Sequence, residues 1–237
     1  MTTSGDDTTK PTALERSLRL ITDVRQGEAP LALALTLNVF LLLSAYYVLK
    51  PVREALILTL PNGAEYKSYM SGAIAVALLF AVPAYAFFVD RLPRLKLVVG
   101  VTLFFALHLV AFFLASQVDS LRPGLGLLFY LWIGLFNVMV VAQLWSFAND
   151  IYTPDQGKRL FPLVAFGASV GAAVGSKIAS WLVEPLGVYR LLLLGAALLG
   201  VCAFLYVVAE RMSAVLKRQA AAPTEAPNAT SGNKRLP

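Results

Sequence analysis

Long apolar runs dominate the pattern of this chain of 237 residues. Each run is close to twenty residues long, which spans about 30 Å of hydrocarbon at ~1.5 Å of rise per helical residue. The strands of a membrane barrel would be shorter and alternating, and the helices of a soluble bundle would carry polar faces. The pattern therefore predicts an all-α integral membrane protein with six transmembrane helices. The runs lie at about residues 31–49, 69–89, 97–116, 124–148, 161–183 and 189–209.

The composition agrees with this pattern. Hydrophobic residues make up 58% of the chain, charged residues make up 14%, and the mean hydropathy is +0.69. Ordinary soluble domains carry about 25% charged residues. The single cysteine, Cys202, excludes an intramolecular disulfide and a cysteine metal cluster. A large soluble enzyme core is therefore not the expected fold.

Basic residues are divided unevenly between the two sets of predicted loops. If residues 1–30 lie in the cytoplasm, fourteen Lys and Arg residues fall on that side and five on the other. The positive-inside rule then places both termini in the cytoplasm of a cell membrane, most simply a bacterial inner membrane. Because the basic residues are scattered over several loops, we expect lipid and not nucleic acid as the partner. The outer five are Lys50, Arg53, Lys67, Arg122 and Arg190.

The chain divides into three parts. Residues 1–30 form a predicted cytoplasmic N-terminal segment, in which 13–29 are expected to form an amphipathic interfacial helix. Residues 31–210 form the six-helix domain. Residues 211–237 are expected to be a disordered cytoplasmic tail or linker, because after Arg218 the sequence is rich in Ala, Pro, Thr, Asn and Ser.

The fifth apolar run carries three glycines at intervals of four. Gly167, Gly171 and Gly175 form a bare stripe on one helix face. Such a stripe lets the backbone of a neighbouring helix approach closely. Tight helix contact is the expected role, and a flexing or substrate-lining role is the alternative.

Charged residues follow the first apolar run. Lys50 and Arg53 share a helix face with Tyr46, and the helix is expected to continue past Pro51. Glu54 lies four residues after Lys50, within reach of an ion pair. One interpretation is a set of interfacial side chains that reach water. The other is a positive wall of a water-filled cavity that attracts anions.

Polar residues also gather at the end of the fourth run. Gln143, Ser146 or Phe147, and Asp150 share a face there at a spacing of three or four, and Asn149 precedes the carboxylate. Asp150 is either an ordinary helix-end residue, or a charge partner of the basic cluster or a gate. Lys177, inside the fifth run, either reaches outward to water or lines the cavity. The candidate substrate-binding residues are Lys50, Arg53, Gln143, Asn149, Asp150 and Lys177.

No pattern for nucleophilic catalysis, metal binding or a phosphate loop occurs in the sequence. The glycine-rich stretches lie in predicted membrane helices and not in strand-to-helix turns. We therefore expect a protein that is not an enzyme and has neither a metal nor a cofactor.

A short basic loop separates the second and third runs. Residues 90–96 (DRLPRLK) resemble the loop motif of the major facilitator superfamily, Asp-Arg-x-Gly-Arg-Arg/Lys. Asp90, Arg91 and Arg94 match, whereas Pro93 replaces the glycine. The resemblance implies a gating role for the three matching residues and a fold like one six-helix half of such a transporter.

Two further stretches resemble the bacterial and plastid ATP/ADP antiporters. Residues 47–56 (YVLKPVREAL) look like the first-helix motif of that family. Residues 145–150 (WSFAND) and 158–163 (KRLFPL) are similar to its Trp-Gly-Phe-Ala-Asn-Glu and Lys-Arg-Phe-Tyr-Pro-Leu. By this resemblance Arg53 falls on a family lysine, and Asp150 falls on a family glutamate implicated in transport.

The resemblance implies ATP and ADP binding and nucleotide exchange by alternating access. It covers roughly residues 31–210, which is half of such a transporter, since family members have about twelve helices in two halves. The chain is expected to be either a fragment or a natural half that pairs with itself or with another chain. The alternative function is a membrane scaffold or anchor that keeps the half-fold without transport.

Overall fold

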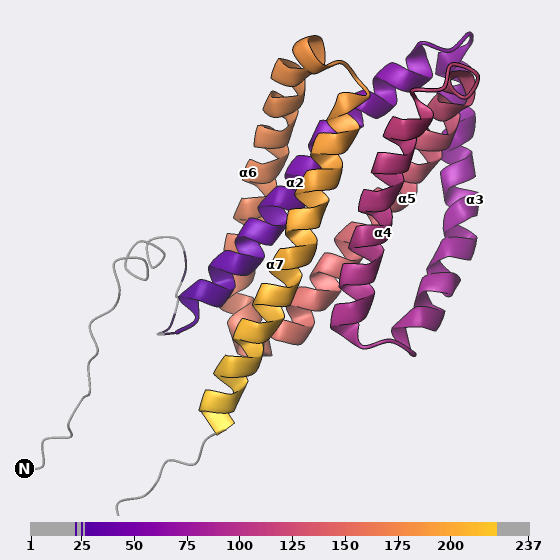
Figure 1. Ribbon diagram of the computed structural model, residues 1–237. Helices are drawn as coiled ribbons and strands as arrows, with labels where there is room; N and C mark the ends of the chain where they lie inside the picture. The colour runs from indigo at the N-terminus through magenta and orange to yellow at the C-terminus, as the bar shows by residue number, and fades with distance from the viewer. Residues whose placement is uncertain (1–21, 23–24, 26, 222–237) are drawn as a thin grey trace, which may run out of the picture.

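Six long helices make up the computed structural model, which describes Thr22, Arg25 and residues 27–221 (Figure 1). All six are long and apolar enough to cross a membrane, and no strand occurs among the described residues. For the described residues, the prediction of an all-α, multi-pass membrane protein with six long apolar helices is therefore confirmed. The expected interfacial helix over 13–29 falls largely outside the described residues. The helices are α2 (Ala29–Leu58), α3 (Gly63–Val89), α4 (Arg94–Ala115), α5 (Arg122–Ile151), α6 (Pro154–Leu186) and α7 (Arg190–Ala221).

The first and last helices differ in how well their ends were predicted. Helix α2 continues through Pro51 to Leu58, as expected. The predicted disorder from residue 211 onward was wrong as far as Ala221, because α7 continues to that residue. Met212 and Leu216, four residues apart on this extension, pack against the hydrophobic core. Their spacing gives the extension one apolar face, which keeps it helical.

The bundle has two ends, named here as they stand in Figure 1. At the lower end lie the start of α2, the α3–α4 and α5–α6 turns, and the end of α7. At the upper end lie the α2–α3, α4–α5 and α6–α7 turns. For the described residues, the two predicted loop sets therefore lie at opposite ends. The lower end is the one that the positive-inside rule assigns to the cytoplasm.

Helix α2 is central to the packing. It lies against α6 and α7, and also against α5 and α3, while α4 packs on α7 and α5 (Figure 1). Its fully buried positions include Leu35, Val39, Leu42 and Leu49. Buried apolar residues on α4, α5 and α7 complete one continuous core.

The glycine stripe of α6 faces α2 directly. A Cβ atom on Gly167 would lie 2.7 Å from the Thr36 side chain, and one on Gly171 would lie 2.3 Å from the Phe40 carbonyl oxygen. A Cβ atom on Gly175 would lie 2.5 Å from the carbonyl oxygen of Ser44. The stripe therefore serves as the close helix contact that its spacing predicts.

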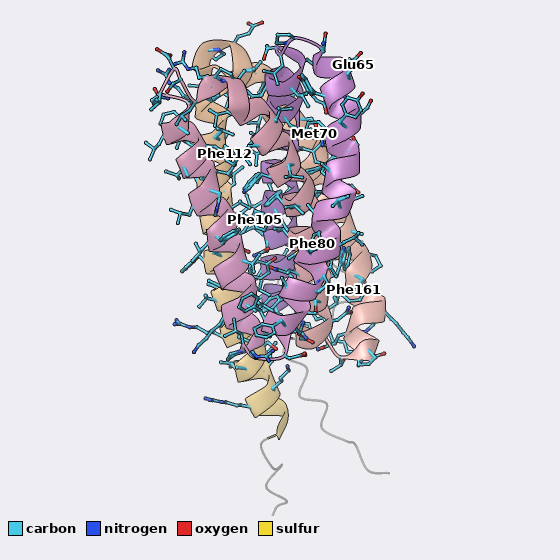
Figure 2. All side chains as sticks on the ribbon, turned by 90° about the vertical axis from the view of Figure 1, so that its right-hand side faces the viewer. Glu65, Met70, Phe80, Phe105, Phe112 and Phe161 are labelled. Atoms are coloured by element: carbon cyan, nitrogen blue, oxygen red, sulfur yellow. The ribbon has the colours of Figure 1, made fainter. Side chains whose placement is uncertain are left out.

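Helix α3 stands at the edge of the bundle (Figures 1 and 2). Gly63 is its single buried residue, and all of α3 lies within the described range. Large apolar side chains such as Leu79 and Phe80 are 72% and 74% exposed. Because hydrocarbon is as apolar as these side chains, their exposure suits a helix that faces lipid.

Candidate functional site

A tight turn between α2 and α3 builds the upper site. Asn62 adopts a left-handed conformation with φ of 58°. A Cβ atom on Gly63 would lie 2.3 Å from the Ile57 carbonyl oxygen, so the turn needs glycine there. The chain reverses direction within a few residues, and Lys67 of α3 returns alongside Glu54 of α2. The Lys67 Nζ atom lies 2.6 Å from the Glu54 carboxylate.

Arg53 occupies the most enclosed position of the upper site. Its Nε atom donates to Glu54 Oε1 at 3.1 Å, and its Nη2 atom donates to the same oxygen. The guanidinium lies over the Tyr130 ring at 4.7 Å. Its side chain is only 16% exposed. The Tyr130 hydroxyl in turn lies 3.4 Å from Ser71 Oγ, so α2, α3 and α5 meet around this one cation.

Lys50 completes what we call the upper basic cluster, defined as Lys50, Arg53, Glu54 and Lys67. Glu54 does not pair with Lys50, as its spacing suggested, but with Arg53 and Lys67. Lys50 is exposed, and its Nζ atom lies 5.4 Å from the centre of the Tyr47 ring. The cluster thus holds three cations against one carboxylate, and its positive excess favours an anion.

The lower end carries a second charged site between α4 and α5. Arg94 Nε lies 2.6 Å from Asp150 Oδ2, and Arg94 Nη1 also donates to Ser146 Oγ. Both members of this lower ion pair are partly exposed, at 37% and 43%. The predicted shared face of Ser146 and Asp150 is confirmed, because one arginine reaches both.

The other loop-motif residues behave differently from Arg94. Arg91 donates to the Phe87 carbonyl oxygen at 3.0 Å, and its guanidinium lies 3.5 Å from the centre of the Phe87 ring. Asp90 is exposed at the end of α3. Arg91 is therefore turned onto its own helix, whereas Arg94 ties the loop to α5.

The two charged sites lie at opposite ends of the bundle. Tyr130, under Arg53, and Asp150 are both on α5, and twenty residues of helix between them correspond to about 30 Å. The structure therefore does not bring Asp150 together with Lys50 and Arg53. Of the roles considered for Asp150, a partner of the Lys50 and Arg53 cluster is excluded in this conformation, and a gate at the lower end is compatible with it.

The remaining candidate residues are dispersed. Gln143 is 1% exposed, and neither atom of its amide has a hydrogen-bond partner among the described residues. Asn149 is exposed next to Asp150. Lys177 is exposed on α6, with its Nζ atom 5.0 Å from the centre of the Trp181 ring. A buried amide without partners is costly, which makes Gln143 the candidate with the strongest need for a ligand or a water.

The sequence analysis missed a third polar site at the lower end. Arg159 Nη1 and Nη2 each lie 3.0 Å from a carboxylate oxygen of Glu28, and Gln156 donates to Glu28 at 3.0 Å. The Thr153 and Gln156 side chains form a capping box that starts α6. The side chains of Arg159 and Glu28 are only 13% and 12% exposed. The sequence did contain one indication of this pair. Glu28 and Arg159 both lie near the start of a helix, and both were predicted on the cytoplasmic side of the membrane.

The lowered pKa of Glu28 leads us to expect that the protein loses stability at acidic pH. Burial acts to raise this pKa, but hydrogen bonds from Arg159, Gln156 and the Arg25 backbone outweigh it, so the pKa lies below its ordinary value of 4.5. Since the folded-state pKa is lowered, the contribution of Glu28 to stability is present above 4.5 and is lost as the pH falls through the folded-state pKa.

The expected result is that the gap in unfolding free energy between the wild type and Glu28→Gln shrinks as the pH falls below about 4.5. Unfolding with sodium dodecyl sulfate in mixed micelles, repeated across this range, measures it. A gap that stays constant down to the lowest accessible pH would contradict the assignment.

Comparisons with models of known protein families, with curated proteins and with solved structures gave no match to this chain. Among the described residues, no group of three or more His, Cys, Asp or Glu side chains is placed to hold a metal ion. The function is therefore interpreted from the geometry of the bundle and from the motifs in the sequence.

Proposed function

We propose that the chain forms one six-helix half of a transporter that moves an anionic solute by alternating access, with ATP and ADP as the first candidate substrates. The order of helix neighbours in the bundle is the observation that carries this proposal. If the first three helices are exchanged with the last three, α2 changes places with α5, α3 with α6 and α4 with α7. Most packing partners are then preserved.

This exchange can be followed pair by pair. Helix α2 packs on α6 as α5 packs on α3, and α2 packs on α7 as α5 packs on α4. The exchange leaves two packed pairs unchanged, α2 with α5 and α4 with α7, because it only swaps the two members of each pair. Major facilitator transporters nest two three-helix repeats of opposite orientation in each half. The neighbour pattern supports an architecture of that kind, with a second six-helix unit required to complete a substrate cavity.

The upper basic cluster supports an anionic substrate. Arg53 uses Nε and one N–H of Nη2 on Glu54, so the two N–H groups of Nη1 and the second N–H of Nη2 are left to donate to a ligand. Lys50 has no carboxylate partner among the described residues and lies one helical turn away from Arg53. Arginine offers phosphate two donors in a planar fork, and lysine adds a point charge. A nucleotide phosphate chain fits that pair of cations.

The lower ion pair supports a gate at the opposite end. Breaking an exposed or half-exposed ion pair costs little, typically below about 1 kcal/mol. Arg94 and Asp150 are exposed enough to exchange partners with a second six-helix unit as the lower end opens and closes. A weak pair at one end and a cation-rich site at the other are compatible with alternating access.

Nucleotide exchange tests the proposal. Proteoliposomes loaded with ADP, and containing the purified protein assembled with a second six-helix unit (a second copy or a partner chain), are expected to take up labelled ATP. Arg53→Ala is expected to lower the uptake rate about tenfold to a hundredfold, since a charge-assisted hydrogen bond contributes roughly 1.5–3 kcal/mol. Arg53→Lys should retain part of the rate, because the charge remains and the fork is lost.

Arg190→Ala is the matched control, since it removes one exposed cation from the same end of the bundle outside the cluster. Its uptake rate is expected to stay within about twofold of the wild type, as for surface charges in general. If the transporter completed by its second six-helix unit exchanges no nucleotide and takes up no other phosphorylated anion, the transport proposal fails. The non-transporting scaffold is then favoured.

A further inference from the structure

We propose that the groove between α3 and α4 is a binding site for one anionic phospholipid, with an acyl chain in the groove and the phosphate at the lower end. The structure has a cavity there of about 580 Å3, lined by α3, α4 and one side of α5. Ligand pockets usually occupy roughly 300–1,000 Å3. This site lies away from the upper basic cluster and is independent of the proposed transport function.

The walls of the groove are apolar and partly open to the surroundings. Phe88 of α3 and Phe104 of α4 are 49% and 54% exposed. The floor is the Trp132 side of α5, where Phe105 packs on the Trp132 ring with centroids 5.4 Å apart. Phe105 lies on the part of α4 near α3 (Figure 2). In a bilayer this groove opens at the depth of the hydrocarbon, so lipid chains are the apolar material available to fill it.

The groove exists because the two halves of the bundle are packed differently. Helix α6 lies against α2 through three glycines, at backbone contact distance. Helix α3 takes the equivalent place against α5, and there Gly134 instead faces the branched side chain of Ile74. Towards the lower end α3 and α5 diverge (Figure 1), and the space beside α3 stays open.

The length and the chemistry of the groove match a lipid chain with a charged head. Along α4 the lining runs from Lys96 to Phe105, about 14 Å of helix, which suits an extended acyl segment. Lys96 lies at the lower end of this lining, in the first turn of α4, and is exposed. Arg91 is nearby in the same loop, and Asp90 is the one carboxylate of that loop.

The charge at the mouth selects the type of lipid. A basic pocket between membrane helices on the cytoplasmic side attracts anionic head groups, and each nearby Lys or Arg contributes about 1 kcal/mol, or about fivefold in affinity. Lys96 and Arg91 stand against the one loop carboxylate, Asp90, while the neighbouring Arg94 and Asp150 neutralise each other as an ion pair, so a positive excess of one charge is left at this end. Phosphatidylglycerol is therefore expected to bind better than zwitterionic phosphatidylcholine, which offers the same chains without net charge.

Trp132 supplies a direct readout, because it lines the groove. A protein that keeps Trp132 alone is made by Trp145→Phe and Trp181→Phe, and is placed in phosphatidylcholine vesicles. A small fraction of chain-brominated phosphatidylglycerol is expected to quench Trp132 about fivefold more effectively than the same fraction of brominated phosphatidylcholine. A protein that keeps only Trp181, which is 65% exposed, and carries Lys177→Ala to remove the cation 5.0 Å from that ring, should be quenched equally by both lipids.

Two substitutions test the site with matched controls. Gly100 lines the groove, and a Cβ atom there would meet nothing within 4 Å, so Gly100→Leu adds a side chain to the groove wall at an open position. It should abolish the preference for the anionic lipid, whereas Gly200→Leu, equally unobstructed but on α7, should not. Lys96→Ala should reduce the preference severalfold, and the exposed Lys158→Ala should leave it unchanged.

Size-exclusion elution in detergent checks that each variant is folded. Equal quenching of Trp132 by both brominated lipids would overturn the proposal, as would a preference that survives Gly100→Leu. Protection of Trp132 from both lipids would also overturn it, and would show that a second copy or another protein segment covers the groove.

Discussion

Replacing Gly171 with alanine is expected to destabilise the bundle by about 3 kcal/mol, the upper part of the range for overpacking a tight contact. The new Cβ atom would lie 2.3 Å from the Phe40 carbonyl oxygen and 2.9 Å from the Phe40 Cα atom. These are backbone atoms, so no side chain can rotate away. Helix α6 must move off α2, which also stretches the 3.0 Å hydrogen bond from Ser44 Oγ to the Gly171 carbonyl oxygen.

Unfolding with sodium dodecyl sulfate in mixed micelles measures this effect. The matched control is Gly200→Ala in α7, where a Cβ atom meets nothing within 4 Å. That variant is expected to be neutral or slightly stabilised, because alanine is the better helix former. Equal stability of the two variants would contradict the close approach of α2 and α6.

Removal of Arg159 has the second large expected effect. Arg159→Ala leaves the Glu28 carboxylate, 12% exposed, without the cation that lies 3.0 Å from both of its oxygens. A mostly buried charge without its partner costs about 3 kcal/mol or more. The same detergent titration should show this loss for Arg159→Ala, and little change for the neighbouring exposed Lys158→Ala.

A double variant separates the pair from other effects. Glu28→Gln combined with Arg159→Ala removes both charges, so the carboxylate no longer lacks a partner. The double variant is expected to be more stable than Arg159→Ala alone. Additive losses in the two single variants would instead mean that the side chains do not act as a pair.

The partners of the candidate functional residues were only partly predictable from the sequence. Spacing along the chain relates residues within one helix, but not residues on different helices. Within one helix, spacing was enough to place Ser146 and Asp150 on one face, and Arg94 meets both. Across helices spacing says nothing, so the local rule that favoured Lys50 for Glu54 failed against Lys67, which the tight α2–α3 turn brings to 2.6 Å. Tyr130 under Arg53 had no signal in the sequence.

Sequence by itself determined the membrane class, the six long apolar helices of the described residues and the glycine contact face of this protein. These follow from length, hydropathy and the 3.6-residue period, which act within single helices. Tertiary structure alone decided that Arg159 pairs with Glu28, that Lys67 and not Lys50 pairs with Glu54, and that α3 stands off from the bundle to leave a groove. Such pairings depend on how helices pack side by side, and apolar surfaces in a membrane leave that choice open.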